Sequence, residues 1–187
     1  MFRFSLFLII SFYVVSAAAQ TDHPNIIFIL ADDLGYGDIS SLNEEGKIKT
    51  PNVDRIAHAG IRFTDAHTSS SVCTPSRYGI LTGRYNWRGT LKSGVLRPYE
   101  APLIRPDRTT MASMLKQKGY QTACIGKWHL GFNWKTKDGA KPVDTESKNN
   151  LDYKASITGG PVDIGFDYFL EWMRPIIHLT LLYITAV

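Results

Sequence analysis

Cysteine is scarce in this chain, because Cys73 and Cys124 are the two cysteines among 187 residues. A framework of several disulfides is therefore excluded, although one bond between the two would be the ordinary outcome in an oxidising compartment. If chemistry at Cys73 consumes its thiol instead, Cys124 is left alone in the apolar, strand-like run 122–125. We would then expect Cys124 to be buried and unreactive. The spacing leaves both interpretations open.

Clusters of one charge sign are also missing. The chain has 21 Lys and Arg residues against 17 Asp and Glu residues, a net charge of +4 and a pI near 9.0, but the basic residues are scattered along it. Nucleic-acid-binding proteins gather such residues in one stretch or on one face, so we predict no nucleic-acid partner. The mild positive excess would suit an acidic substrate.

Long apolar runs are absent except near the N-terminus. Arg3 supplies a positive charge, residues 4–15 are apolar apart from two serines, and residues 17–19 are three alanines that offer a cleavage site. The run is shorter than the roughly 20 residues that a membrane-spanning helix needs. We therefore predict a signal peptide over residues 1–19, no stable membrane anchor, and a secreted, periplasmic or lumenal protein. An uncleaved anchor is the alternative.

The rest of the sequence has a globular composition, with 44% hydrophobic and 20% charged residues, which predicts one domain. Residues 25–31 form a continuous β-branched and apolar run, typical of a strand buried on both faces of a sheet. Further strands are predicted for residues 61–66 and 120–125, and helices for residues 50–60, 76–82 and 109–118.

The stretch from Cys73 to Arg84 combines residues that fit a reactive centre. Pro75 suits the first turn of a helix and Gly83 its end, which places Cys73 just before the helix. The free N–H groups and the dipole at a helix N-terminus favour an anion, and Arg77 adds a fork of donors one turn along. A tetrahedral oxyanion would fit there. The alternative is an ordinary cysteine at a helix start.

Polar residues also follow both predicted central strands. Asp32 and Asp33 come directly after residues 25–31, and two adjacent carboxylates suit a calcium or magnesium ion, although a solvated turn fits the spacing equally well. After residues 120–125, alternation places Lys127 and His129 on one side of the chain. Together they could bind an oxyanion and move a proton, or they could form a charged pair on an exposed strand end.

These stretches resemble the sulfatase family. Its signature Cys-x-Pro-Ser-Arg followed by Thr-Gly-Arg is matched by residues 73–77 and 82–84, its Asp-Asp pair by Asp32 and Asp33, and its Gly-Lys-Trp-His-Leu-Gly string by residues 126–131. Residues 165–169 look like the segment that follows in the family. The match of residues 73–77 and 82–84 is specific, because a lone cysteine near a helix start is common but this complete string is not.

The resemblance implies a sulfuric ester hydrolase, arylsulfatase-like, acting on aryl or carbohydrate sulfate esters. A maturation enzyme would convert Cys73 to formylglycine, the nucleophile; Asp32, Asp33 and the oxygen at residue 73 would bind calcium or another divalent cation. Lys127 would bind the sulfate, and Arg77 and Lys127 would stabilise charge. His129, beside the formylglycine, would take the proton in the elimination. The implied fold is α/β and alkaline phosphatase-like, a mixed central sheet with helices on both faces.

The resemblance covers roughly residues 24–169, the first part of the family's longer catalytic domain. We assign residues 20–174 to that N-terminal part and residues 175–187 to an unmatched apolar tail, so the expected fold is truncated. The family's later Asp-Asn pair, histidine and second lysine match no position here. Two alternatives remain, namely an inactive fragment and a related phosphoester hydrolase on the same scaffold.

Overall fold

The computed structural model describes residues 23–143, 148–171 and 179–186. The predicted signal peptide lies outside this part of the chain. The strands are β1 (Ile26–Ala31), β2 (Tyr120–Gly126), β3 (Tyr168–Leu170) and β4 (Leu179–Ala186), and the α-helices are α2 (Pro51–Ala59), α3 (Cys73–Thr82) and α4 (Met111–Lys116). Short 3-10 helices form at η2 (Tyr36–Asp38), η3 (Asn86–Arg88) and η4 (Pro161–Ile164).

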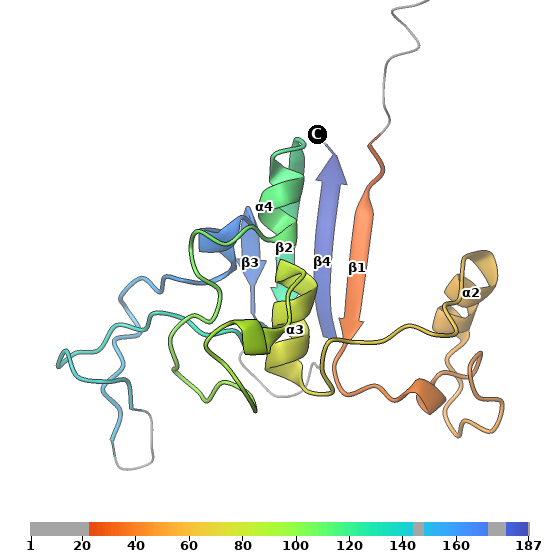
Figure 1. Ribbon diagram of the computed structural model, residues 1–187, viewed down its shortest axis with the longest axis horizontal. Helices are drawn as coiled ribbons and strands as arrows, with labels where there is room; N and C mark the ends of the chain where they lie inside the picture. Colours follow the sequence, from red (N-terminus) through yellow and green to blue (C-terminus); the bar gives the residue numbers. More distant parts are fainter. Residues whose placement is uncertain (1–22, 144–147, 172–178, 187) are drawn as a thin grey trace, which may run out of the picture.

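The four strands form one mixed sheet in the order β1-β4-β2-β3. β4 pairs antiparallel with both β1 and β2, while β2 and β3 are parallel. β1, β2 and β3 therefore run in the same direction, and their carboxyl ends lie at one edge of the sheet. In Figure 1 this edge lies beside the start of α3. The mixed sheet confirms the predicted fold class.

The C-terminal strand β4 lies inside the sheet rather than at its edge. Its register places Leu182 opposite Phe28 of β1 and Cys124 of β2. Leu182 and Ile184 are 3% and 1% exposed. Apolar residues of the segment predicted as a tail therefore contribute to the core, and its position depends on pairing with strands far away in the sequence.

The helices α3 and α4 lie on one face of the sheet (Figure 1). α4 packs against β2 and against α3, and the buried cluster beneath them includes Tyr78, Leu81, Ala112, Cys124, Phe166 and Leu182. Helices were expected on both faces. Within residues 23–143, 148–171 and 179–186, however, the opposite face leaves large apolar side chains exposed, namely Ile27, Ile29, Tyr168, Leu170 and Tyr183.

α2 confirms the helix predicted between Thr50 and Gly60, whereas the strand predicted for residues 61–66 is wrong. In the described chain this segment is irregular, and Ile61 and Phe63 are 83% and 74% exposed. A β-prone run becomes a strand only where another strand supplies its hydrogen bonds. α2 itself has no buried residue and stands away from the sheet (Figure 1).

Candidate active site

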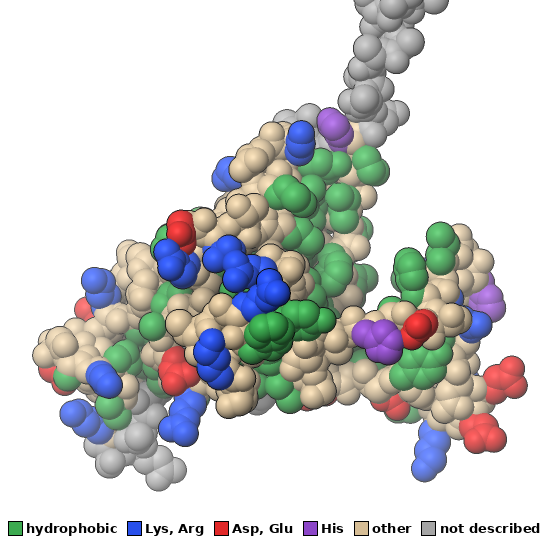
Figure 2. Space-filling view, viewed as in Figure 1, with side chains coloured by type: hydrophobic (Ala, Val, Ile, Leu, Met, Phe, Trp, Pro, Cys, Tyr) green, Lys and Arg blue, Asp and Glu red, His purple; other side chains and the backbone are tan. Residues whose placement is uncertain are grey.

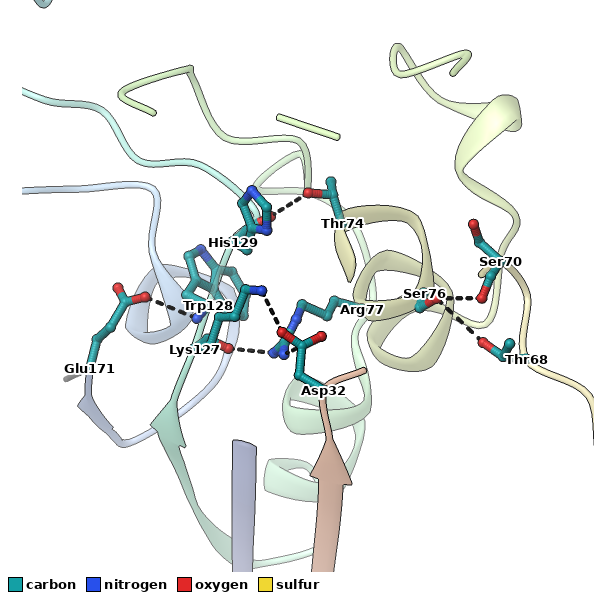
Figure 3. A network of polar contacts seen from close by, with 10 residues as sticks. All are labelled: Asp32, Thr68, Ser70, Thr74, Ser76, Arg77, Lys127, Trp128, His129 and Glu171. Carbon is teal, nitrogen blue, oxygen red and sulfur yellow. Dashed lines mark hydrogen bonds and ion pairs between the residues drawn. The ribbon is translucent and has the colours of Figure 1, made fainter. Parts of the chain in front are cut away.

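The three predicted motifs meet at the end of the sheet where the carboxyl ends of β1, β2 and β3 lie. Asp32 is the first residue after β1, Lys127 the first after β2, and α3 begins beside them (Figure 3). One open pocket of about 280 Å³ is lined by residues from the end of β1, the loop before α3 and the first turn of α3, among them Asp32, Asp33, Ser70, Cys73, Ser76 and Arg77. A strand end and a helix start thus build one concave site.

Helix α3 begins at Cys73, three residues earlier than predicted, so Cys73 lies in its first turn rather than just before it. Val72 is extended and its carbonyl accepts the N–H of Ser76 at 3.2 Å, which starts the helix there. The preceding loop is tied to this turn, because the Ser76 hydroxyl donates to the Ser70 carbonyl at 2.7 Å (Figure 3). Cys73 is partly exposed at the pocket, while its neighbour Thr74 is buried.

Arg77 joins the helix to both strand ends. Its Nη1 donates to the Lys127 carbonyl at 2.5 Å, and its Nη2 lies 3.6 Å from Oδ1 of Asp32. The second oxygen of Asp32 pairs with the Lys127 amine (Figure 3). The side chains of Arg77 and Asp32 are 4% and 7% exposed. Since buried charges are costly unless they are paired, this network fixes the relative positions of the three segments.

His129 is held in an uncommon backbone conformation, with φ of 54°. The Thr74 hydroxyl donates to its carbonyl at 3.0 Å, and its ring Nε2 lies 3.0 Å from the Leu96 carbonyl. Because a carbonyl can only accept, Nε2 carries the proton and Nδ1 has a free lone pair. No hydrogen-bond partner for the buried Nδ1 occurs in the part of the chain described here.

Burial lowers the pKa of His129 below its ordinary value, and the positive charges of Lys127 and Arg77 act in the same direction. The hydrogen bond to Leu96 opposes them. The ring is therefore neutral at neutral pH. A neutral imidazole with a free Nδ1 can accept a proton, which is the chemistry of a general base.

Asp33 completes the carboxylate pair at the end of β1. It has φ of 60° and is exposed, whereas Asp32 is buried in the ion-pair network. Among the described residues no group of three or more His, Cys, Asp or Glu side chains is arranged to hold a metal ion. Two carboxylates on one pocket fit a hard cation by their chemistry, but they fall short of the six to eight oxygens that calcium takes.

The two cysteines do not form a disulfide. Cys124 lies on the core face of β2 and is 1% exposed, and burial raises the pKa of its thiol to about 12. The expected burial of Cys124 is thereby confirmed, and its low reactivity stays a prediction. Cys73 remains free at the pocket, as a reactive position requires.

Sequence reasoning missed Glu171 at this edge. It follows β3 directly, and its Oε1 accepts the backbone N–H of Trp128 at 3.1 Å (Figure 3). Burial raises the pKa of Glu171, against the effect of this hydrogen bond and of the charges on Arg77 and Lys127. The available signal in the sequence was that Glu171 directly follows a short strand. Only the pairing of β3 with β2 shows that this strand ends beside the site.

Comparison with known proteins agrees with this geometry. The model of the Sulfatase family matches residues 24–176. An N-acetylgalactosamine-6-O-sulfatase of Bacteroides thetaiotaomicron is 42% identical over 149 residues, which is 80% of this chain and 26% of that protein. Arylsulfatase A of Bos taurus is 45% identical over 118 residues, which is 63% of this chain and 23% of that protein.

A solved structure supports the same relationship. It comes from work on glycosaminoglycan metabolism by Bacteroides thetaiotaomicron and superimposes with a TM-score of 0.62 at 39% identity, covering 76% of this chain and 27% of that one. The chain thus spans about a quarter of the length of the relatives that it matches. Because the family model matches most of the chain, and ion pairs of Asp32 with Arg77 and Lys127 join the three motifs, the chain belongs to the sulfatase family.

Proposed function

We propose that this chain carries part of the active site of a formylglycine-dependent sulfate ester hydrolase, with aryl or carbohydrate sulfates as substrates. The observation that carries the proposal is the meeting of Cys73, Asp32 and Arg77 at one pocket, with the Lys127 amine paired to Asp32. A nucleophile position at a helix N-terminus, two cations and a neutral imidazole form a suitable set for transfer of a tetrahedral anion.

In this proposal Arg77 and Lys127 stabilise the negative charge that develops on the sulfate oxygens. The guanidinium is held rigidly between Asp32 and the Lys127 carbonyl, so little reorganisation is needed when substrate binds. Lys127 would exchange part of its contact with Asp32 for the sulfate. His129 would accept the proton that is released when sulfate leaves, through its free Nδ1.

Residue 73 supplies the nucleophile after a maturation enzyme has oxidised its thiol to an aldehyde. One hydroxyl of the hydrated aldehyde attacks sulfur and displaces the alcohol, and the second then expels sulfate and restores the aldehyde, a step that a serine could not perform. Asp32, Asp33 and the oxygen at residue 73 would hold calcium or another divalent cation, whose charge would polarise the sulfate and the attacking oxygen.

We also propose a secreted, periplasmic or lumenal location, because formylglycine formation and the apolar N-terminal segment both fit an exported chain. No helix within the described residues combines the length and apolarity needed to cross a membrane. Nucleic acid is not a proposed partner.

Mass spectrometry of the tryptic peptide that contains residue 73 tests the nucleophile. The protein would be secreted from cells that express a maturation enzyme, and the expected mass is that of formylglycine. Cys73→Ala is the matched control. An unmodified thiol, or a disulfide with Cys124, would contradict the proposal.

Turnover of aryl sulfate and aryl phosphate esters tests the reaction. We expect low activity from this chain alone, because the described residues supply two carboxylates where calcium takes six to eight oxygens. Any activity should prefer sulfate and disappear in Cys73→Ala. Preference for the phosphate ester would favour a phosphoester hydrolase, and no turnover by a fully converted protein would favour the inactive alternative.

A further inference from the structure

Glu171 lies at the site without touching the proposed nucleophile. It is the first residue after β3, so the parallel pairing of β3 with β2 brings it to the edge where Lys127 and Trp128 leave β2. The charges of Arg77 and Lys127 both act on its carboxylate. The first residue after each of the three parallel strands is therefore charged, namely Asp32, Lys127 and Glu171 (Figure 3).

In the segment 127–129, a backbone group of each residue is hydrogen-bonded to a side chain from another part of the fold. Arg77 of α3 donates to the Lys127 carbonyl at 2.5 Å, and Thr74 of α3 donates to the His129 carbonyl at 3.0 Å. Both of these bonds come from the same helix. Glu171 supplies the third, from β3, by accepting the Trp128 N–H at 3.1 Å. The carboxylate thus holds the segment on the side away from α3.

Because Trp128 lies between Lys127 and His129, its backbone hydrogen bond to Glu171 affects the positions of both. Its side chain is 2% exposed, and its indole N–H donates to the Gly131 carbonyl at 3.1 Å. His129 adopts a left-handed conformation immediately afterwards, which costs energy for a residue with a side chain. A segment under such strain keeps its conformation only where its surroundings hold it, so the loss of one tether should affect the directions of the Lys127 amine and the His129 ring.

We propose that Glu171 is a positioning residue that holds the backbone of Trp128 and thereby orients Lys127 and His129 for a sulfate group. The proposal rests on the function proposed above, because it takes these two side chains as the sulfate-binding and proton-accepting groups. Glu171 acts through the backbone and does not contact the substrate. Its negative charge near two cations should by itself weaken anion binding, so the hydrogen bond and the charge have opposite effects and can be separated.

The test compares Glu171→Gln with Glu171→Met. Both variants remove the charge and keep a side chain of similar length, but only glutamine retains an oxygen acceptor for the Trp128 N–H. We expect the Trp128 amide to exchange with deuterium about tenfold faster in the methionine variant than in the glutamine variant. The amides of Thr122 and Cys124 in β2 should exchange at equal rates in the two variants, because neither substitution should disturb the sheet.

Binding of inorganic sulfate, measured by calorimetry, then tests the consequence. We expect Glu171→Gln to bind sulfate at least as tightly as wild type, and Glu171→Met to bind it about tenfold more weakly than Glu171→Gln. Glu100 offers a matched control, because its exposed carboxylate also accepts a backbone N–H, that of Arg97 at 2.7 Å. The same two substitutions at Glu100 should leave the affinity for sulfate unchanged.

The possible outcomes separate this proposal from the function on which it rests. Equal exchange of the Trp128 amide in the two variants would show that Glu171 does not hold the segment, and unequal exchange with equal sulfate affinity would overturn its positioning role. Wild-type protein that binds no sulfate would overturn the proposed oxyanion site and the positioning role with it. The exchange rates would still show whether Glu171 holds the Trp128 N–H.

Discussion

At the residue scale, the two cysteines differ in how far they are buried. Cys124 is 1% exposed and burial raises its pKa to about 12, whereas Cys73 is partly exposed at the pocket. In protein made without a maturation enzyme, we expect iodoacetamide to alkylate Cys73 in the native state and Cys124 only after denaturation. Peptide mass spectrometry measures both. Equal labelling of the two thiols in the native protein would contradict this assignment.

His129 should make stability depend on pH. Its folded-state pKa is lowered by burial and by neighbouring cations, so below the ordinary value of 6.5 the unfolded chain binds more protons than the folded one. The contribution of the neutral ring to stability is therefore complete above pH 6.5 and is lost as the pH falls through the interval down to the folded pKa. Urea unfolding across this range should show the midpoint falling with pH.

The control for this pH dependence is His129→Asn, because asparagine tolerates a left-handed backbone better than most residues. The unfolding midpoint of this variant should fall less steeply with pH than that of wild type over the same interval. Identical slopes in the two proteins would assign the effect to other titrating groups.

The site residues that could be predicted from the sequence are those that lie in contiguous motifs. Cys73, Arg77, Lys127 and Asp32 are each marked by neighbours in sequence, and the structure brings them together. Glu171 lies in no such motif. Its contact with the site depends on a strand pairing between distant segments, since its hydrogen-bond partner Trp128 is 43 residues away in the sequence. The roles proposed for these residues in catalysis stay predictions.

Helix α3 can be tested at the element scale through Gly79. Alanine within a helix is normally better than glycine by about 1 kcal/mol. Here, however, a Cβ would lie 2.2 Å from Oγ and 2.9 Å from Cβ of Ser69, in the loop that precedes the helix. We expect Gly79→Ala to lower the free energy of unfolding by about 1–3 kcal/mol. Chemical denaturation measures the change.

Two further variants isolate the cause. Removing the Ser69 side chain should relieve the clash, so Ser69→Gly combined with Gly79→Ala should recover most of the loss. Gly83→Ala is the comparison, because Gly83 ends α3 at φ of 64° and a Cβ at this position would meet no other part of the described chain within 4 Å. Its cost, about 1 kcal/mol, is conformational and should not respond to Ser69→Gly. A Gly79→Ala protein as stable as wild type would contradict the close packing.

The elements themselves were predictable where local chemistry decides them. Pro51 and Gly60 bound α2, and the apolar run after Asn25 forms β1. The run from Ile61 has a similar β-prone composition but stays irregular in the described chain, whereas residues 179–186 enter the middle of the sheet. Composition indicates that a segment can form a strand. Whether it does so depends on a partner strand, which only the whole fold supplies.

At the scale of the whole molecule, the sheet is covered unequally. Among the described residues, α4 packs over β2 and α3 packs against α4 on one face, and Figure 2 shows hydrophobic side chains at the surface beside them. The opposite face carries exposed apolar residues on three strands, namely Ile27, Ile29, Tyr168, Leu170 and Tyr183. Contiguous apolar patches of this kind are rare on soluble monomers and promote association. β1 is also an edge strand, which adds unpaired backbone groups beside the patch.

This exposed face should bind hydrophobic dyes and limit solubility. We expect the 187-residue protein to enhance the fluorescence of anilinonaphthalene sulfonate, and Ile29→Ser to reduce both the enhancement and light scattering at high concentration, because Ile29 is 55% exposed on this face. Serine is used rather than lysine so that charge repulsion at the edge strand does not contribute. Ile56→Ser is the matched control, since Ile56 is 64% exposed but lies on α2, away from the sheet. Equal effects of the two substitutions would mean that total exposed apolar area, and not the sheet face, governs dye binding and association.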